Sequence, residues 1–261
     1  MLNFHLIGSS NENKTAQLTN LCGHKCCCAR RPEGELMFPI GDDRVSGGPA
    51  AIVTLGLVVL NVLVFLFEAS QPPGALQSFI QAWGVVPREY TLGHDLAPTI
   101  PLPFWSTLIT SMFLHGGWMH LGGNMLYLWI FGDNLEKVMG NARFLVFYLA
   151  CGIAAGLAHI LFSGASNVPT VGASGAISGV LGGYLVLFPR NRVRVLTRGG
   201  IVALPAIAVL GFWIVIQLIN GLGSLAVRTE TGGVAYMAHI GGFIAGIVLV
   251  KLMARPAAAI A

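Results

Sequence analysis

Six long apolar segments constrain this chain more than any other feature of its sequence. A helix needs about 20 apolar residues to cross the hydrocarbon core of a bilayer. The segments cover roughly residues 50–70, 117–135, 144–162, 174–188, 201–222 and 234–253, and the fourth of them is short. Only 10% of the 261 residues are charged, whereas soluble domains carry about 25%. The sequence therefore predicts an all-α, polytopic membrane protein with six transmembrane helices.

The N-terminal region differs from this core. Residues 1–36 are polar, without periodicity and without the basic-then-apolar pattern of a signal peptide. We expect a disordered extension or a mis-assigned start, with Met37 as the alternative initiator, followed by a core at 37–254 and a short tail at 255–261. Four of the five cysteines lie in Cys22–Cys28, a crowding that does not match a disulfide framework. Zinc binding by this cluster stays an open alternative, although three adjacent cysteines cannot easily face one tetrahedral centre.

Lysine and arginine are unequally divided between the loops. Eight fall on one side of the predicted bundle and two, Arg88 and Arg228, on the other. The eight are Lys137, Arg143, Arg190, Arg192, Arg194, Arg198, Lys251 and Arg255. The positive-inside rule places the basic side and both termini in the cytoplasm. These clustered charges do not form the basic stripe of a nucleic-acid-binding protein. The long connection 71–114 then lies outside, and its Trp83 and Trp105 suggest that it rests in the membrane interface.

Polar residues gather at one depth of this predicted bundle. The second, fourth and sixth segments run in the same direction, so their N-terminal ends, with His120, Asn124, Ser174 and His239, share one leaflet. Polar groups in hydrocarbon are costly and usually mark a functional site. Ser174 follows Gly172-Ala173 and precedes Gly175, at a helix start where free N–H groups favour an oxyanion. The alternative role of Ser174 is an N-cap.

A nucleophilic serine needs a base, and His239 is the candidate. Lys137 and Lys251 lie at the opposite ends of their helices, which disfavours a Ser–Lys dyad. Close helix approach would bring Ser174 within hydrogen-bond reach of His239, while glycine-driven packing around a structural histidine is the alternative. Small residues recur at every fourth position on both helices: Gly175, Gly179 and Gly183, and Ala238, Gly242 and Gly246.

His120 and Asn124 are four residues apart and share a helix face. Both side chains can donate to an oxyanion, and an interhelical polar clamp is the equally weighted alternative. A third interpretation, a metal site of His115, His120 and His239, is disfavoured because no Asp or Glu joins them at this depth. We expect neither a metal nor another cofactor.

Together these motifs resemble the rhomboid family of intramembrane serine proteases, of bacterial type. The matching residues are His115, His120 and Asn124, then Gly172-Ala173-Ser174-Gly175, then Ala238-His239, Gly242 and Gly246. The resemblance implies a six-helix core, a Ser174 nucleophile, a His239 base, and an oxyanion site of His120, Asn124 and the Ser174 N–H. It also implies structural roles for His115, Gly172, Gly175 and Glu136. Two positions depart from the family: Ser106 follows Trp105 where arginine is frequent, and Ser178 stands where some members stack a tyrosine on the base.

The resemblance implies a serine endopeptidase of a bacterial inner membrane whose partners are the lipid bilayer and transmembrane protein substrates. The competing class is an inactive rhomboid-like protein that binds or escorts transmembrane helices. A small-solute transporter is a third class, and no internal inverted repeat supports it. Phe212 and Trp213 are candidates for a substrate gate, and His159 is expected to be a satisfied polar group or to line a water cavity.

Overall fold

The structure, a computed structural model, describes residues 38–45, 47–227 and 234–254, with only the backbone for 225–227. The chain divides into units Met1–Glu35 and Leu36–Ala261, and everything below belongs to the second. The predictions for the N-terminal extension, the Cys22–Cys28 cluster, Met37 and the tail at 255–261 lie outside the described residues.

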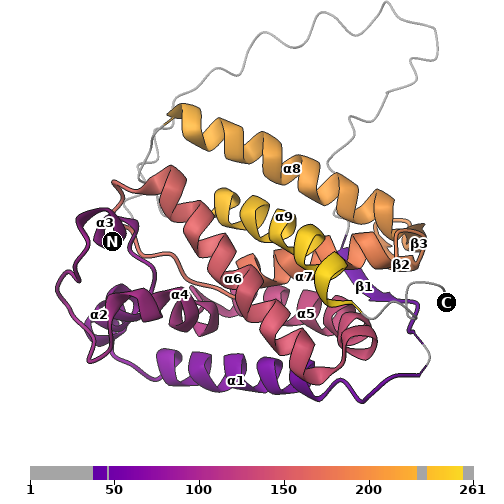
Figure 1. Cartoon of the computed structure of the whole chain (residues 1–261), viewed down its shortest axis with the longest axis horizontal. Coiled ribbons are helices and arrows are strands. Elements are labelled where there is room, and N and C mark those ends of the chain that lie inside the picture. The colour runs from indigo at the N-terminus through magenta and orange to yellow at the C-terminus, as the bar shows by residue number, and fades with distance from the viewer. Residues whose placement is uncertain (1–37, 46, 228–233, 255–261) are drawn as a thin grey trace, which may run out of the picture. The chain divides into compact units, whose positions relative to one another are not determined.

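Six helices occupy the six apolar segments (Figure 1). They are α1 (Ile52–Ala69), α5 (Trp118–Met139), α6 (Asn141–Ser163), α7 (Ser174–Leu187), α8 (Ala206–Val227) and α9 (Tyr236–Met253). Four of them, α1, α6, α8 and α9, are long and apolar enough by themselves to cross a membrane. Helix α5 is less apolar because Asp133, Glu136 and Lys137 lie in its last turns, and α7 has only 14 residues. The predicted polytopic helical bundle is confirmed.

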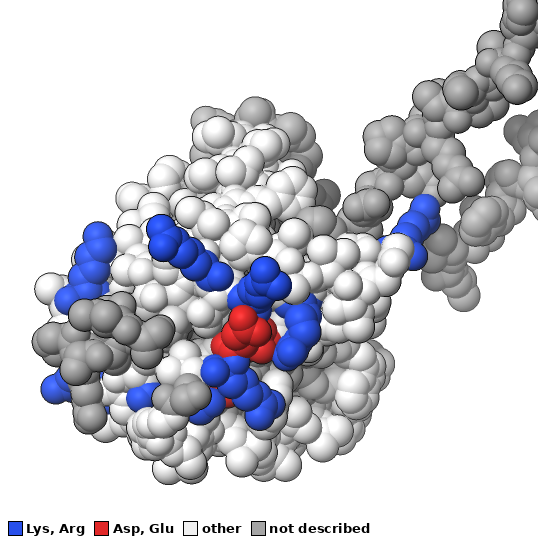
Figure 2. Space-filling view, turned by 90° about the vertical axis from the view of Figure 1, so that its right-hand side faces the viewer, with Lys and Arg blue, Asp and Glu red and all other residues white. Residues whose placement is uncertain are grey.

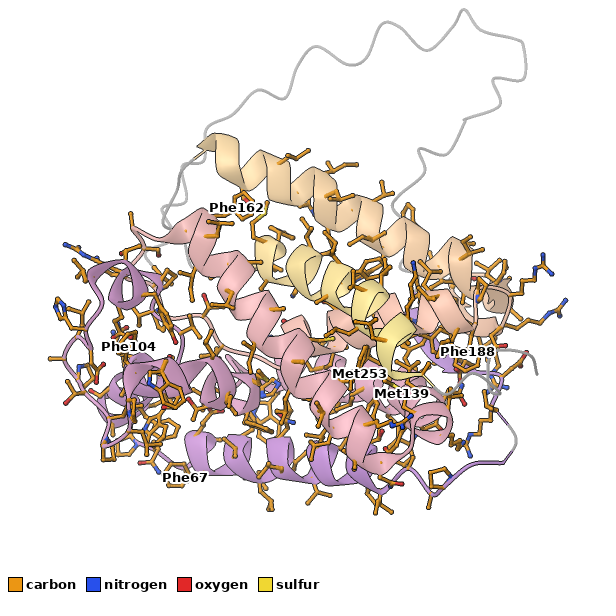
Figure 3. The ribbon with its side chains drawn as sticks, viewed as in Figure 1. Phe67, Phe104, Met139, Phe162, Phe188 and Met253 are labelled. Atoms are coloured by element: carbon orange, nitrogen blue, oxygen red, sulfur yellow. The ribbon has the colours of Figure 1, made fainter. Side chains whose placement is uncertain are left out.

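The helices alternate in direction (Figure 3). Phe67 and Phe162, near the ends of α1 and α6, lie toward one end of the bundle. Met139, Phe188 and Met253, at the ends of α5, α7 and α9, lie toward the other. Helices α5, α7 and α9 therefore start at the same end, as the loop charges predict.

Helix α7 forms the centre of the bundle. Ten of its 14 residues are buried, and six of these ten are glycine, alanine or serine. A methyl group added to Gly246 would lie 2.0 Å from the carbonyl oxygen of Gly179, and one added to Gly242 would lie 2.1 Å from that of Gly175. The backbones of α7 and α9 are thus in direct contact, as the small-residue pattern predicts.

The carboxylate of Glu136 caps the start of α1. It accepts hydrogen bonds from the N–H groups of Val53 (2.8 Å) and Thr54 (2.7 Å), from the Thr54 hydroxyl (2.7 Å) and from Asn141 Nδ2 (2.8 Å). The first N–H groups of a helix have no partner within it. Glu136 therefore ties α1 to the end of α5, which is a structural role.

The connection from α1 to α5 folds at the end where α5, α7 and α9 begin (Figure 1). It forms α2 (Pro73–Trp83), α3 (Pro87–Leu92), η1 (Phe104–Ser106), α4 (Thr107–Thr110) and η2 (Ser111–Phe113). Two contacts fasten it: Glu68 accepts from the His115 N–H (3.1 Å), and the Thr110 hydroxyl donates to the Trp83 carbonyl (2.8 Å). Among the described residues it contains no spanning segment, in agreement with the sequence.

A small antiparallel sheet closes the opposite end. Strand β1 (Phe38–Asp42) pairs with β2 (Arg192–Thr197), which pairs with β3 (Gly200–Pro205). The expectation that the fifth helix starts at residue 201 is wrong, because residues 201–205 belong to β3. Val193 and Val195 are buried, whereas Arg192, Arg194 and Leu196 are exposed, and this two-residue period is typical of strands. Lys and Arg side chains gather at this end around a few Asp and Glu side chains (Figure 2).

Asp42 anchors the sheet to the helices. Its buried carboxylate accepts from Tyr184 Oη (2.5 Å) and Asn134 Nδ2 (2.7 Å), while Arg194 donates to its main-chain carbonyl (2.9 Å). Burial raises the pKa of this carboxyl from 3.8 to about 6. The sheet end is therefore fixed by a polar network that links β1, α5, α7 and β2.

Candidate active site

Ser174 is the first residue of α7, and its side chain faces α9. Gly172 holds a φ of +126°, which favours glycine, and donates its N–H to the Ser111 carbonyl (2.8 Å). This turn places Ser174 at the first position of α7. The cap residue of α7 is Ala173, with no side-chain capping bond, and the Ser174 hydroxyl instead lies 2.9 Å from His239 Nε2. The alternative role of Ser174 as an N-cap is thus not what the structure shows.

His239 occupies the first turn of α9 and is buried. Its Nε2 meets Ser174 Oγ, and its Nδ1 lies 2.8 Å from Gln217 Oε1 on α8. The Trp213 ring lies beside the imidazole, with centroids 5.9 Å apart and planes inclined by 34°. The Ser178 hydroxyl donates to the Ser174 carbonyl (2.6 Å). The aromatic ring that lies beside His239 therefore comes from α8 and not from α7.

His120 and Asn124 lie next to the turn before Ser174. A Cβ built on Gly172 would lie 2.8 Å from His120 Nε2 and 3.7 Å from Asn124 Nδ2. The Gly116 N–H donates to His120 Nδ1 (3.2 Å), so Nδ1 carries a lone pair and, in the neutral ring, Nε2 carries the proton. Asn124 Nδ2 is buried without a partner among the described residues. Two side-chain donors therefore lie beside Gly172, two residues before Ser174.

His115 packs behind these donors. Its ring lies 5.2 Å from that of His120, centroid to centroid, and its two nitrogens have no hydrogen-bond partner among the described residues. Burial, with a smaller contribution from neighbouring His120, lowers the pKa of His115 to about 4, so the ring is neutral at pH 7. The described part of the chain holds no group of three His, Cys, Asp or Glu side chains arranged to bind a metal.

A small pocket opens beside Ser174. It is lined by residues of α6, α7 and α9 and of the turn before α7, including Ser174, Gly172, Gly175, His159, Thr170 and Ala238. Its volume of about 30 Å³ accommodates one or two water molecules. His159 Nε2 lies 2.8 Å from the Thr170 hydroxyl, and His159 also lines the pocket. It therefore matches both sequence alternatives, a polar group with a partner and a residue at a cavity.

Sequence reasoning missed Gln217. Phe212 and Trp213 were predicted only as candidates for a substrate gate, and the structure places the Trp213 ring beside His239. An amide within a 22-residue apolar helix is itself a signal, because polar groups in hydrocarbon need a partner. Lys137, in contrast, pairs with Asp133 (3.0 Å) at the far end of α5.

The chain is similar in sequence to one protein family and to several named proteins. The family model for the Rhomboid domain matches residues 103–256. Rhomboid protease GluP of Bacillus subtilis is 36% identical over 155 residues, 59% of this chain and 27% of its own. Rhomboid protein 1, mitochondrial, of Saccharomyces cerevisiae is 30% identical over 193 residues, 72% of this chain and 50% of its own. Putative rhomboid protease YdcA of Bacillus subtilis is 33% identical over 164 residues, 62% of this chain and 73% of its own. The chain thus spans about a quarter and a half, respectively, of the first two relatives.

Proposed function

This chain belongs to the rhomboid family, and from that premise we propose that it is an intramembrane serine endopeptidase acting through a Ser174–His239 dyad. The observation that carries the proposal is the 2.9 Å contact between Ser174 Oγ and His239 Nε2 at the start of α7. A serine hydroxyl becomes a competent nucleophile when a base accepts its proton. Several similar proteins bear the name rhomboid protease, which supports the same reaction class.

The reaction proceeds in two halves. Ser174 Oγ attacks the scissile carbonyl carbon while its proton passes to His239 Nε2. The carbonyl oxygen becomes an oxyanion, which His120 Nε2–H, Asn124 Nδ2–H and the Ser174 N–H stabilise. Collapse breaks the C–N bond, and His239 returns the proton to the leaving amine. Water from the neighbouring pocket then attacks the acyl carbon, with His239 taking its proton. The bond between that carbon and Ser174 Oγ breaks, His239 returns the proton to Oγ, and the acyl group leaves as a carboxylic acid.

The substrates we propose are transmembrane proteins. An α-helix in lipid shields its carbonyls in internal hydrogen bonds, so the scissile segment must unwind before Ser174 can attack. We expect glycine, alanine or other helix-weakening residues around the cleaved bond. The charges at the sheet end (Figure 2) support a cytoplasmic location for that end. The dyad then opens toward the outer leaflet, both termini are cytoplasmic, and a bacterial inner membrane is the proposed location.

Labelling with a fluorophosphonate probe tests the proposal. We expect purified protein to label, and both Ser174→Ala and His239→Ala to lose the signal together with cleavage of a reporter transmembrane substrate. His94→Ala is the control for the histidine, because His94 is exposed and far along the chain from the dyad. Cleavage that persists in Ser174→Ala would refute the nucleophile. If labelling is lost in His159→Ala but not in His239→Ala, His159 is the base instead of His239. A wild-type protein that binds transmembrane helices without labelling would support the inactive class instead.

A further inference from the structure

Gln217 is a buried polar side chain on a helix that is otherwise largely exposed. Residues around it on α8, such as Ile216, Leu218 and Ile219, face outward. The buried positions recur at spacings of four and seven, and they form one face: Ala206, Leu210, Gln217 and Gly221. Gln217 thus lies on the face of α8 that meets α9, and its Oε1 is 2.8 Å from His239 Nδ1. The mechanism above does not use this contact.

The contact determines which nitrogen of His239 carries the proton. A carbonyl oxygen only accepts, so Gln217 Oε1 requires an N–H at Nδ1. In the neutral ring the lone pair then lies at Nε2, which faces the Ser174 hydroxyl at 2.9 Å. The opposite tautomer would present an N–H to Ser174 and leave no base for its proton. The neighbouring Trp213 ring restricts rotation of the imidazole.

We propose that Gln217 is a positioning residue that holds His239 in its basic tautomer, and that the dyad is complete only while α8 lies against α9. This inference rests on the proposed function. The dependence on α8 follows because Gln217, which accepts from His239, belongs to a helix that buries few other residues. Gly221, one turn further, maintains the close approach: a Cβ there would lie 2.8 Å from Met237 Cε and 3.1 Å from Ile240 Cδ1. Displacement of α8 would therefore remove the acceptor from His239.

Three substitutions on α8 separate the hydrogen bond from packing. Gln217→Leu removes the acceptor at similar volume, whereas Gln217→Glu keeps an acceptor and removes the amide donor. Asn220→Leu is the matched control, because Asn220 is exposed on the same helix. We expect Gln217→Leu to lower the labelling rate and kcat on the order of 10²-fold, with KM and Tm unchanged. Gln217→Glu should stay close to wild type at a pH high enough to keep His239 neutral beside the new carboxylate, and Asn220→Leu should stay close to wild type at every pH.

The tautomer is read directly by ¹⁵N NMR of the histidine side chains, with His239→Ala used to assign the signal. We expect a protonated Nδ1 in the wild type and in Gln217→Glu, and loss of this preference in Gln217→Leu. A stable Gln217→Leu protein with wild-type rate, or an equal loss in Gln217→Glu at a pH where His239 is neutral, overturns the positioning role. Because the NMR measurement needs no activity, its outcome is independent of the proposed function, which fails instead if the wild-type protein does not label.

Gly221→Leu tests the dependence on α8 without touching Gln217. The larger side chain should push α8 away from the start of α9, so the labelling rate and the Nδ1–H preference of His239 should fall together. Gly223→Leu is the control, since a Cβ at Gly223 meets nothing within 4 Å. A Gly221→Leu protein that retains the wild-type tautomer overturns the dependence on α8, whether or not its rate falls.

Discussion

The cap that Glu136 provides for α1 makes a quantitative prediction about stability. In Glu136→Gln an NH₂ group replaces one carboxylate oxygen, and it faces the N–H of Val53 or of Thr54 instead of accepting from it. A buried N–H without an acceptor costs about 1–3 kcal/mol. The remaining hydrogen bonds lose the assistance of the charge, which roughly halves their strength. We expect the free energy of unfolding to fall by about 3–5 kcal/mol.

Asp133→Asn is the matched comparison, because it removes an acidic side chain one turn earlier on α5. Asp133 only pairs with Lys137 in a partly exposed i, i+4 ion pair, which contributes about 0.5 kcal/mol or less. Equilibrium unfolding in mixed micelles, followed by tryptophan fluorescence, measures both changes. A loss below about 1 kcal/mol in Glu136→Gln, or equal losses in the two variants, would refute the assignment of Glu136 as the cap of α1.

Three further predictions follow from the site and the packing. Asn124→Ala should lower kcat by about 10²–10³ with little change in KM, and a change in KM alone would contradict its role as an oxyanion donor. Gly246→Ala should lower the free energy of unfolding by about 1–3 kcal/mol, because its methyl group would lie 2.0 Å from the Gly179 carbonyl oxygen. Gly56→Ala in α1, where a Cβ has no atom within 4 Å, should raise the free energy of unfolding by up to about 1 kcal/mol. Similar shifts of Tm in Gly246→Ala and Gly56→Ala would contradict the close packing of α7 against α9. The raised pKa of Asp42 means that the folded state binds its proton more tightly, so the free energy of unfolding should fall as pH rises from 3.8 to about 6. A pH series should show this fall in the wild type and not in Asp42→Asn.

The sequence predicted the helices because lipid imposes a strong pattern. A spanning helix must be long and apolar, so the segments are visible without tertiary information, and loop charges set their directions. The Ser174–His239 contact could be predicted from the sequence for the same reason. Two helices with small residues at every fourth position approach closely, and both polar residues occupy the same depth.

The rest depends on contacts that periodicity does not encode. Residues 201–205 were predicted to begin the fifth helix because they are apolar. In the structure they pair with β2, including Val193 and Val195, and form a strand. Gln217 and His239 are 22 positions apart on different helices, and nothing local distinguishes this glutamine from one that faces a cavity. Only the rotation of α8 about its axis, set by the packing at Leu210 and Gly221, decides where its amide points.

The shortness of α7 determines how far the Ser174 hydroxyl lies from the water on its own side of the membrane. A helix of 14 residues extends about 21 Å along its axis, whereas the hydrocarbon layer is about 30 Å thick. If the far end of α7 lies at one boundary of that layer, Ser174 is recessed by about 9 Å from the other. On the proposed function, the chain then selects a bond by its height in the bilayer. The position of a weak point along a substrate helix, measured from the lipid headgroups, would matter more than the residues on either side of the cut.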